Sequence, residues 1–249
     1  MYIMRSYIGF VLIVLLGLPV FSFSQNKNAR QLNEALSKIV NRYKTDSVIK
    51  VDIFTNIYVN DKSRTKIDSS MGTYFFHKEY IRADMTDGDM SLVNDRWFIS
   101  VSNNYGYMLV DTVINTRQKH PQINPMVFID TTLVDSLINY KLIKKGDDNG
   151  IVMYMSDNGS TVEGTIIYDG RTGRLKYSSY KVEEDYVVNE RSYVEGGYGK
   201  SYIIEMIFTD SWVDEAEADM FDESRFFRIA EGRIVPVAPY EKLRVQRLE

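Results

Sequence analysis

Few side chains in this chain have the types that metal or nucleophilic chemistry requires. It has no cysteine and only two histidines, His77 inside an expected strand and His120 beside Pro121. A metal site needs several ligands held together, so two isolated histidines argue against one. Aspartates cluster at 84–89, 147–148 and 169, but without the ligand spacing of an EF-hand loop, and hairpin turns explain them better. We therefore expect neither a metal nor a cofactor.

Two glycine motifs match catalytic signatures only in part. The run at 196–201, GGYGKS, ends as a phosphate-binding loop does, but Val194 stands where that motif needs its first glycine. A strand pattern, and not a helix, follows the run. Gly159-Ser160 lacks the flanking residues of a nucleophile elbow. With no phosphate loop and no activated nucleophile, we expect a protein that is not an enzyme.

The N-terminal residues have the pattern of an export signal. Arg5 precedes an apolar run over 8–20, and small residues follow at Ser22 and Ser24. We expect a signal peptide over 1–24, cleaved before Gln25, and a periplasmic mature protein. The alternative is an uncleaved anchor, but the run is interrupted by Pro19 and is shorter than the ~20 residues that span a membrane. A formal net charge of −4 offers no basic surface for nucleic acid.

The rest of the chain alternates helical and strand patterns in two halves. A helix is expected over 29–43, with an apolar stripe that must be buried against a sheet, and a second helical segment is expected over 125–139 after Asn124-Pro125. Strands separated by Asp, Asn and Gly turns are expected at 48–59, 72–77, 79–85, 89–94, 96–101 and 105–111, and again at 140–145, 150–156, 161–168, 174–182, 185–194 and 201–209. The predicted fold is mainly β (α+β): a strongly curved antiparallel sheet forming an incomplete barrel, covered by both helices.

Several expected strands are apolar on both faces and rich in methionine. A half-solvated antiparallel sheet would alternate apolar and polar residues instead. Methionine fills irregular space and adapts to variable apolar ligands, although each single methionine is explained as well by an ordinary core. The pattern as a whole favours a cavity.

The order of elements and several local sequences resemble the periplasmic outer-membrane lipoprotein carrier family, the LolA-like proteins. The similarity covers about residues 30–209. It is carried by the first helix and by GTYFFHK at 72–78, SLVNDRWFI at 91–99, INPMVF at 123–128 and YKLIKKG at 140–146. The resemblance implies a half-barrel domain over 25–209 with an apolar cavity for lipoprotein acyl chains, and gate residues at Lys78 or Arg82.

On this resemblance we expect a monomeric, non-enzymatic carrier that moves lipoproteins toward the outer membrane, with an inner-membrane donor and an outer-membrane acceptor as partners. Residues 210–249 are expected to form an acidic linker and a C-terminal extension that packs on the same domain. The alternative is a periplasmic interaction or lipid-sensing module on the same scaffold, with its acidic tail docking a partner. The expected cavity residues are Phe54, Phe75, Trp97, Ile99, Leu109, Met126, Phe128, Leu133, Leu137 and Met153.

Overall fold

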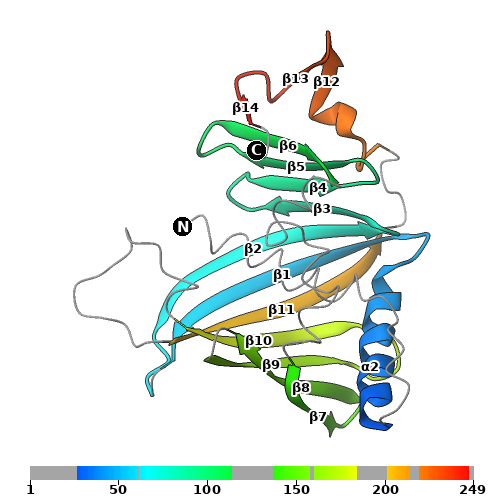
Figure 1. Ribbon diagram of the computed structural model, residues 1–249, viewed down its shortest axis with the longest axis vertical. Helices are drawn as coiled ribbons and strands as arrows, with labels where there is room; N and C mark the ends of the chain where they lie inside the picture. Colours follow the sequence, from blue (N-terminus) through cyan, green and yellow to red (C-terminus); the bar gives the residue numbers. More distant parts are fainter. Residues whose placement is uncertain are drawn as a thin grey trace. The chain divides into compact units, whose positions relative to one another are not determined.

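The computed structural model describes residues 27–60, 62–113, 137–157, 160–183, 201–213 and 219–246 (Figure 1). The predicted signal peptide at 1–24 and the expected strand at 185–194 lie outside these residues. The described part is mainly β, with one α-helix and an antiparallel sheet that does not close into a barrel. The predicted fold class is therefore confirmed.

The helix α2 spans Lys27–Tyr43, two residues longer at its start than the sequence predicts. Its apolar residues recur at helical spacing, and the stripe is buried as expected: Leu32, Leu36, Ile39, Val40 and Tyr43 are each at most 9% exposed. Within the described residues, no helix is both long and apolar enough to cross a membrane.

Twelve strands form one sheet in the order β14-β6-β5-β4-β3-β2-β1-β11-β10-β9-β8-β7, and β12 pairs with β13 in a separate hairpin. Neighbours in the sheet are antiparallel wherever their register is given, except that β14 runs parallel to β6. The strands of the large sheet are β1 (Val48–Val59), β2 (Lys66–His77), β3 (Tyr80–Met85), β4 (Met90–Val93), β5 (Trp97–Ser102), β6 (Tyr107–Thr112), β7 (Leu137–Lys145), β8 (Asp148–Asp157), β9 (Ser160–Asp169), β10 (Leu175–Glu183), β11 (Ser201–Val213) and β14 (Arg244–Gln246). The hairpin strands are β12 (Phe227–Ala230) and β13 (Arg233–Pro236), preceded by a short 3-10 helix, η4 (Glu223–Arg225).

The prediction of a second helical segment over 125–139 is wrong in part. Residues 137–139, predicted as the end of a helix, instead begin strand β7, and 125–136 lie outside the described residues. The apolar residues at 133, 134, 137 and 138 fit a helix by spacing, but Leu137 pairs with Met155 across a bulge in the β7–β8 ladder. Cross-strand pairing overrides a short helical pattern when the neighbouring strand offers a continuous ladder.

Two compact units divide the chain. Unit 1 comprises residues 1–42, 53–70 and 125–210, and unit 2 comprises 43–52, 71–124 and 211–249. Strands β1, β2 and β11 contribute residues to both units. Unit 1 contains α2 and the ladder β7 to β11, whereas unit 2 contains β3 to β6 and the C-terminal residues.

Candidate functional site

One face of the unit 1 ladder is apolar and buried. Residues directly opposite each other in a ladder share a face, so the register links Tyr140, Met153, Gly164, Tyr180 and Ile204 in one row. The adjacent row on the same side, which completes what we call the unit 1 face, is Leu142, Ile151, Ile166, Ser178 and Met206. The side chains at 151, 166, 178 and 206 are fully buried. The opposite side carries charged residues such as Lys181 and Glu205.

Three hydroxyl groups interrupt this apolar surface. The Ser178 Oγ and the phenol oxygens of Tyr140 and Tyr180 are buried, and none makes a close hydrogen bond within the described residues, although Ser178 and Tyr180 interact with each other. Burial raises the pKa of Tyr180, an effect that the neighbouring Ser178 hydroxyl opposes. Buried polar groups in folded proteins are nearly always hydrogen-bonded, so three such groups on one face are unusual.

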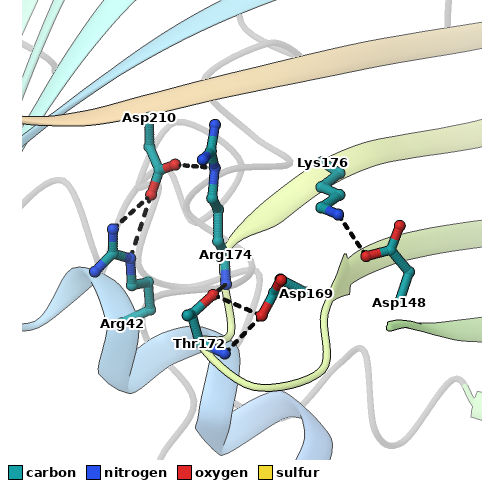
Figure 2. Close-up of polar contacts among 7 residues, drawn as sticks. All are labelled: Arg42, Asp148, Asp169, Thr172, Arg174, Lys176 and Asp210. Carbon is teal, nitrogen blue, oxygen red and sulfur yellow. Dashed lines mark hydrogen bonds and ion pairs between the residues drawn. The ribbon is translucent and has the colours of Figure 1, made fainter. Parts of the chain in front are cut away.

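Charged contacts attach α2 to the end of this face (Figure 2). Residues at even positions of β11 from 202 to 210 are buried, so Asp210 lies on the same side as Ile204 and Met206. Its Oδ2 accepts from Arg42 Nε at 3.2 Å and Nη2 at 3.0 Å, and its Oδ1 is ion-paired with Arg174. The Asp210 side chain is fully buried, so two guanidinium groups compensate one desolvated carboxylate.

The turn before β10 provides a second contact to α2. Lys38 Nζ donates to the Gly170 carbonyl oxygen. Gly173 has a φ of +76°, and a Cβ at this position would collide with the Lys38 carbonyl group, so only glycine lets the turn approach the helix this closely. The turn therefore has a backbone geometry suited to holding the helix.

Asp169 organises the same turn (Figure 2). Its Oδ1 accepts from the Thr172 amide at 2.8 Å, from the Thr172 hydroxyl at 2.9 Å and from the Arg171 amide at 2.9 Å. These bonds favour the carboxylate and lower the pKa of Asp169 to about 2. Nearby, Lys176 Nζ donates to Asp148 at 2.5 Å. The described residues contain no group of three acidic or histidine side chains that could hold a metal. The contacts of Arg42 with Asp210 and of Lys38 with Gly170 form a clamp on α2, and the Lys176–Asp148 pair lies outside this clamp.

Unit 2 also has a buried face, but the chain's own C-terminal segment, residues 219–246, covers it. Phe226 and Phe227 are at most 2% exposed and lie in one core cluster with Leu92, Trp97, Ile99, Val101, Met108 and Val110. The Phe227 ring meets the Trp97 ring edge-on at 5.3 Å, and Phe226 stacks on Tyr240 at 5.5 Å. Aromatic pairs in these geometries stabilise beyond their buried area.

Polar groups of the C-terminal segment form hydrogen bonds with other residues of unit 2 and within the segment. Asn94 Nδ2 donates to the Phe221 carbonyl oxygen at 3.3 Å and to the Glu223 carboxylate at 2.9 Å. Asp222 caps η4 by accepting from the Ser224 amide at 2.7 Å. Residues 244–246 then add β14 beside β6. This segment is therefore a built part of unit 2.

The predicted cavity residues do not share one face. The register places Phe75, Trp97 and Ile99 on the side of unit 2 that the C-terminal segment covers, whereas Leu109 points to the other side. Met153 lies on the unit 1 face and is 6% exposed. Phe54 is 41% exposed, with Lys66 Nζ 5.5 Å from its ring centroid. Leu137 lies in β7, and Met126, Phe128 and Leu133 lie outside the described residues.

The two gate candidates, Lys78 and Arg82, lie in different surroundings. Lys78 lies in the turn between β2 and β3, has a φ of +54° and is ion-paired with Asp46 at 3.3 Å, with both side chains exposed. Arg82 lies on the covered face of unit 2, where its Nε donates to Asp84 at 2.9 Å and its Nη1 donates to the Met220 carbonyl oxygen at 3.3 Å. Arg82 thus contacts the C-terminal segment and Lys78 the loop after α2.

The hydroxyl group of Ser178 was missed by sequence reasoning, as were those of Tyr140 and Tyr180. The sequence of the expected strand at 174–182 indicates only that Ser178 and Tyr180 share one side, because they alternate with Ser179 and Lys181. That alternation does not say which of the two sides is buried.

Comparison with known proteins gives structural likeness only. No family model and no curated protein sequence matches the chain. An uncharacterized conserved protein from Thermus thermophilus has 6% identity and a TM-score of 0.46, over 88% of this chain and 99% of its own. A LolA superfamily protein from Nitrosomonas europaea has 9% identity and a TM-score of 0.33, over 76% and 97%. A domain described as a putative outer membrane lipoprotein-sorting protein, from Vibrio parahaemolyticus, has 9% identity and a TM-score of 0.38, over 77% and 96%. These values are too low to assign the chain to a family.

Proposed function

We propose that the protein is a non-enzymatic periplasmic carrier that holds the acyl chains of lipoproteins or related lipids on the unit 1 face and delivers them toward the outer membrane. The observation that carries this proposal is the unit 1 face itself. It combines a broad apolar surface with buried hydroxyls that make no close hydrogen bond within the described residues. An ordinary core has the first property without the second.

The composition of the unit 1 face suits an acyl chain. Five of its ten residues are isoleucine or methionine, with Met153 and Met206 on neighbouring rows. Methionine is unbranched and flexible, so it can follow chains of different length and shape. Removing ten methylenes from water contributes roughly 8 kcal/mol, which is enough to retain a lipid during transit.

The alternative of a docking module with an acidic tail has less support. Of the acidic residues expected to meet a partner, the three in the described part of the C-terminal segment have contacts within the chain. Asp219 is ion-paired with Arg225 at 3.5 Å, Asp222 caps η4, and Glu223 accepts from Asn94. These carboxylates stabilise the segment that covers unit 2.

Native mass spectrometry tests the carrier proposal directly. The protein is purified from the periplasmic fraction of an expressing bacterium, and its spectrum is expected to contain adducts with the mass of a lipid. A fluorescent fatty-acyl probe is expected to bind saturably and to be displaced by an acylated peptide. Absence of both lipid adducts and saturable binding would contradict the proposal.

A pair of matched substitutions locates the binding surface. Met153→Gln places an amide on the unit 1 face, where an unpaired buried polar group costs about 1–3 kcal/mol, so probe affinity is expected to fall about tenfold. Met71→Gln makes the same chemical change at a residue that is 41% exposed, and probe affinity is expected to stay at the wild-type value. Equal effects of the two substitutions would show that the acyl chain does not contact the unit 1 face.

A further inference from the structure

Ser178 and Tyr180 form a compact pair on the unit 1 face. They are two residues apart in β10, so both side chains project to the same side. The register places Ser178 between Ile166 and Met206, and Tyr180 between Gly164 and Ile204. Ser178 is fully buried. Its hydroxyl interacts with the Tyr180 phenol, whose pKa it lowers, but neither hydroxyl makes a close hydrogen bond within the described residues.

A buried hydroxyl without a close hydrogen bond lowers the stability of the folded protein, and an apolar residue at the same position would not. Leaving a buried hydroxyl unpaired costs about 1–3 kcal/mol, and alanine or phenylalanine would fill the same positions without that cost. A ligand atom that accepts a hydrogen bond would compensate it. The pair therefore indicates a place where a polar part of a ligand is bound.

The surroundings of the pair restrict the charge of that ligand. Their register neighbours on the unit 1 face are Gly164, Ile166, Ile204 and Met206, all uncharged. The buried charge on this face is Asp210, already compensated by two arginines. Burial also raises the pKa of Tyr180, so its phenol remains a neutral donor at physiological pH. A carboxylate would need a cation here, whereas a carbonyl oxygen needs only neutral donors.

We propose that Ser178 and Tyr180 form an uncharged polar subsite that donates hydrogen bonds to the carbonyl oxygen of an acyl ester or amide, while the attached chain lies along the neighbouring apolar rows. This inference rests on the proposed carrier function and adds a preference within it. The subsite selects lipids whose acyl chains are linked through a neutral carbonyl over free fatty acids.

Three probes with the same fluorophore and chain length test the subsite: a methyl ester, the free acid and a hydrocarbon without a carbonyl. The double substitution Ser178→Ala with Tyr180→Phe removes both hydroxyls and preserves the apolar surface. The ester is expected to bind about five- to tenfold more weakly to this variant, as the loss of one to two hydrogen bonds predicts, with hydrocarbon affinity unchanged. Wild-type protein is expected to bind the ester more tightly than the acid.

Ser179→Ala is the matched control, because it removes a hydroxyl from the same strand on the opposite side. Its ester affinity is expected to equal that of the wild type. If the double variant keeps wild-type ester affinity, or if the acid binds wild-type protein best, the subsite is wrong while the carrier function stands. If no probe binds wild-type protein, the carrier function fails and the subsite with it.

Thermal melting separates a ligand site from a structural role. Removing two unpaired buried hydroxyls is expected to leave the melting temperature of the ligand-free double variant unchanged or slightly raised. A lower melting temperature together with an unchanged ester preference would mean that the hydroxyls are paired inside the protein, and would overturn the proposal.

Discussion

The buried faces of units 1 and 2 are completed in different ways. On unit 2 the C-terminal segment inserts Phe226 and Phe227 beside Trp97, and the segment's polar groups find partners such as Asn94. On unit 1, α2 buries its apolar stripe and adds polar contacts at Lys38 and Arg42, and three buried hydroxyls of the face lack a close hydrogen-bond partner among the described residues. The covered face of unit 2 has one buried polar atom without a partner among the described residues, His77 Nδ1 beside Phe221, whereas the unit 1 face has three buried hydroxyls that lack a close partner.

This difference supports the position proposed above for a ligand. A face that is closed by its own aromatic side chains and paired polar groups gains nothing from a lipid, because the lipid would have to displace well-packed rings. A face with unpaired buried donors gains hydrogen bonds when a ligand enters. The comparison agrees with a structural role for the covered face of unit 2 and with the binding role proposed for the unit 1 face.

The largest loss of stability is expected from creating a cavity in the core cluster that the C-terminal segment covers in unit 2. Phe226→Ala removes a ring that is 1% exposed, and the free energy of unfolding is expected to fall by about 3–5 kcal/mol. Phe54→Ala removes the same ring at a position that is 41% exposed, and a loss of about 1 kcal/mol or less is expected. Urea unfolding measures both. Similar losses would mean that the C-terminal segment is not part of the core.

A smaller loss is expected from breaking the charged attachment of α2. Asp210→Ala leaves Arg42 and Arg174 without their buried carboxylate, and because both arginines are partly exposed we expect a loss of about 2–3 kcal/mol. Asp148→Ala, which breaks the partly exposed ion pair with Lys176, is expected to cost about 1 kcal/mol or less. If Asp210→Ala is as mild as this control, the clamp does not hold the helix.

The smallest effect is a pH dependence at the turn beside α2. Three hydrogen bonds lower the pKa of Asp169 from 3.8 to about 2, so its stabilising contribution is complete above pH 3.8 and is lost as the pH falls toward 2. The difference in melting temperature between wild type and Asp169→Asn is therefore expected to shrink over that interval. A difference that stays constant down to pH 2 would contradict this assignment.

Much of the fold could be predicted because it depends on local periodicity and turn chemistry. The strand expected at 48–59 matches β1, and the turns at Asp87-Gly88 and Asn94-Asp95 separate strands as expected. The start of β2 was missed because Lys66–Ser70 are polar apart from Ile67 and resemble a loop. Their strand conformation depends on pairing with a neighbouring strand, which a local pattern does not contain.

Only the general character of the candidate site, an apolar surface, could be predicted from the sequence. Apolar strands and methionines indicated a surface for lipid, but Trp97 and Leu109 were grouped although they lie on opposite sides of the sheet. Which side of a strand is buried depends on register and on distant segments such as Phe226. The hydroxyls of Ser178 and Tyr180 were missed for the same reason, since their lack of a partner is a property of the folded face.

Strand β14 has a consequence for the solution behaviour of the protein. It is three residues long, carries Arg244, and pairs with β6 at the end of the twelve-stranded order. A bare strand at that position would present a row of free amide and carbonyl groups to which another chain could add. The three residues of β14 therefore cover that edge of β6 and protect it against pairing with another chain.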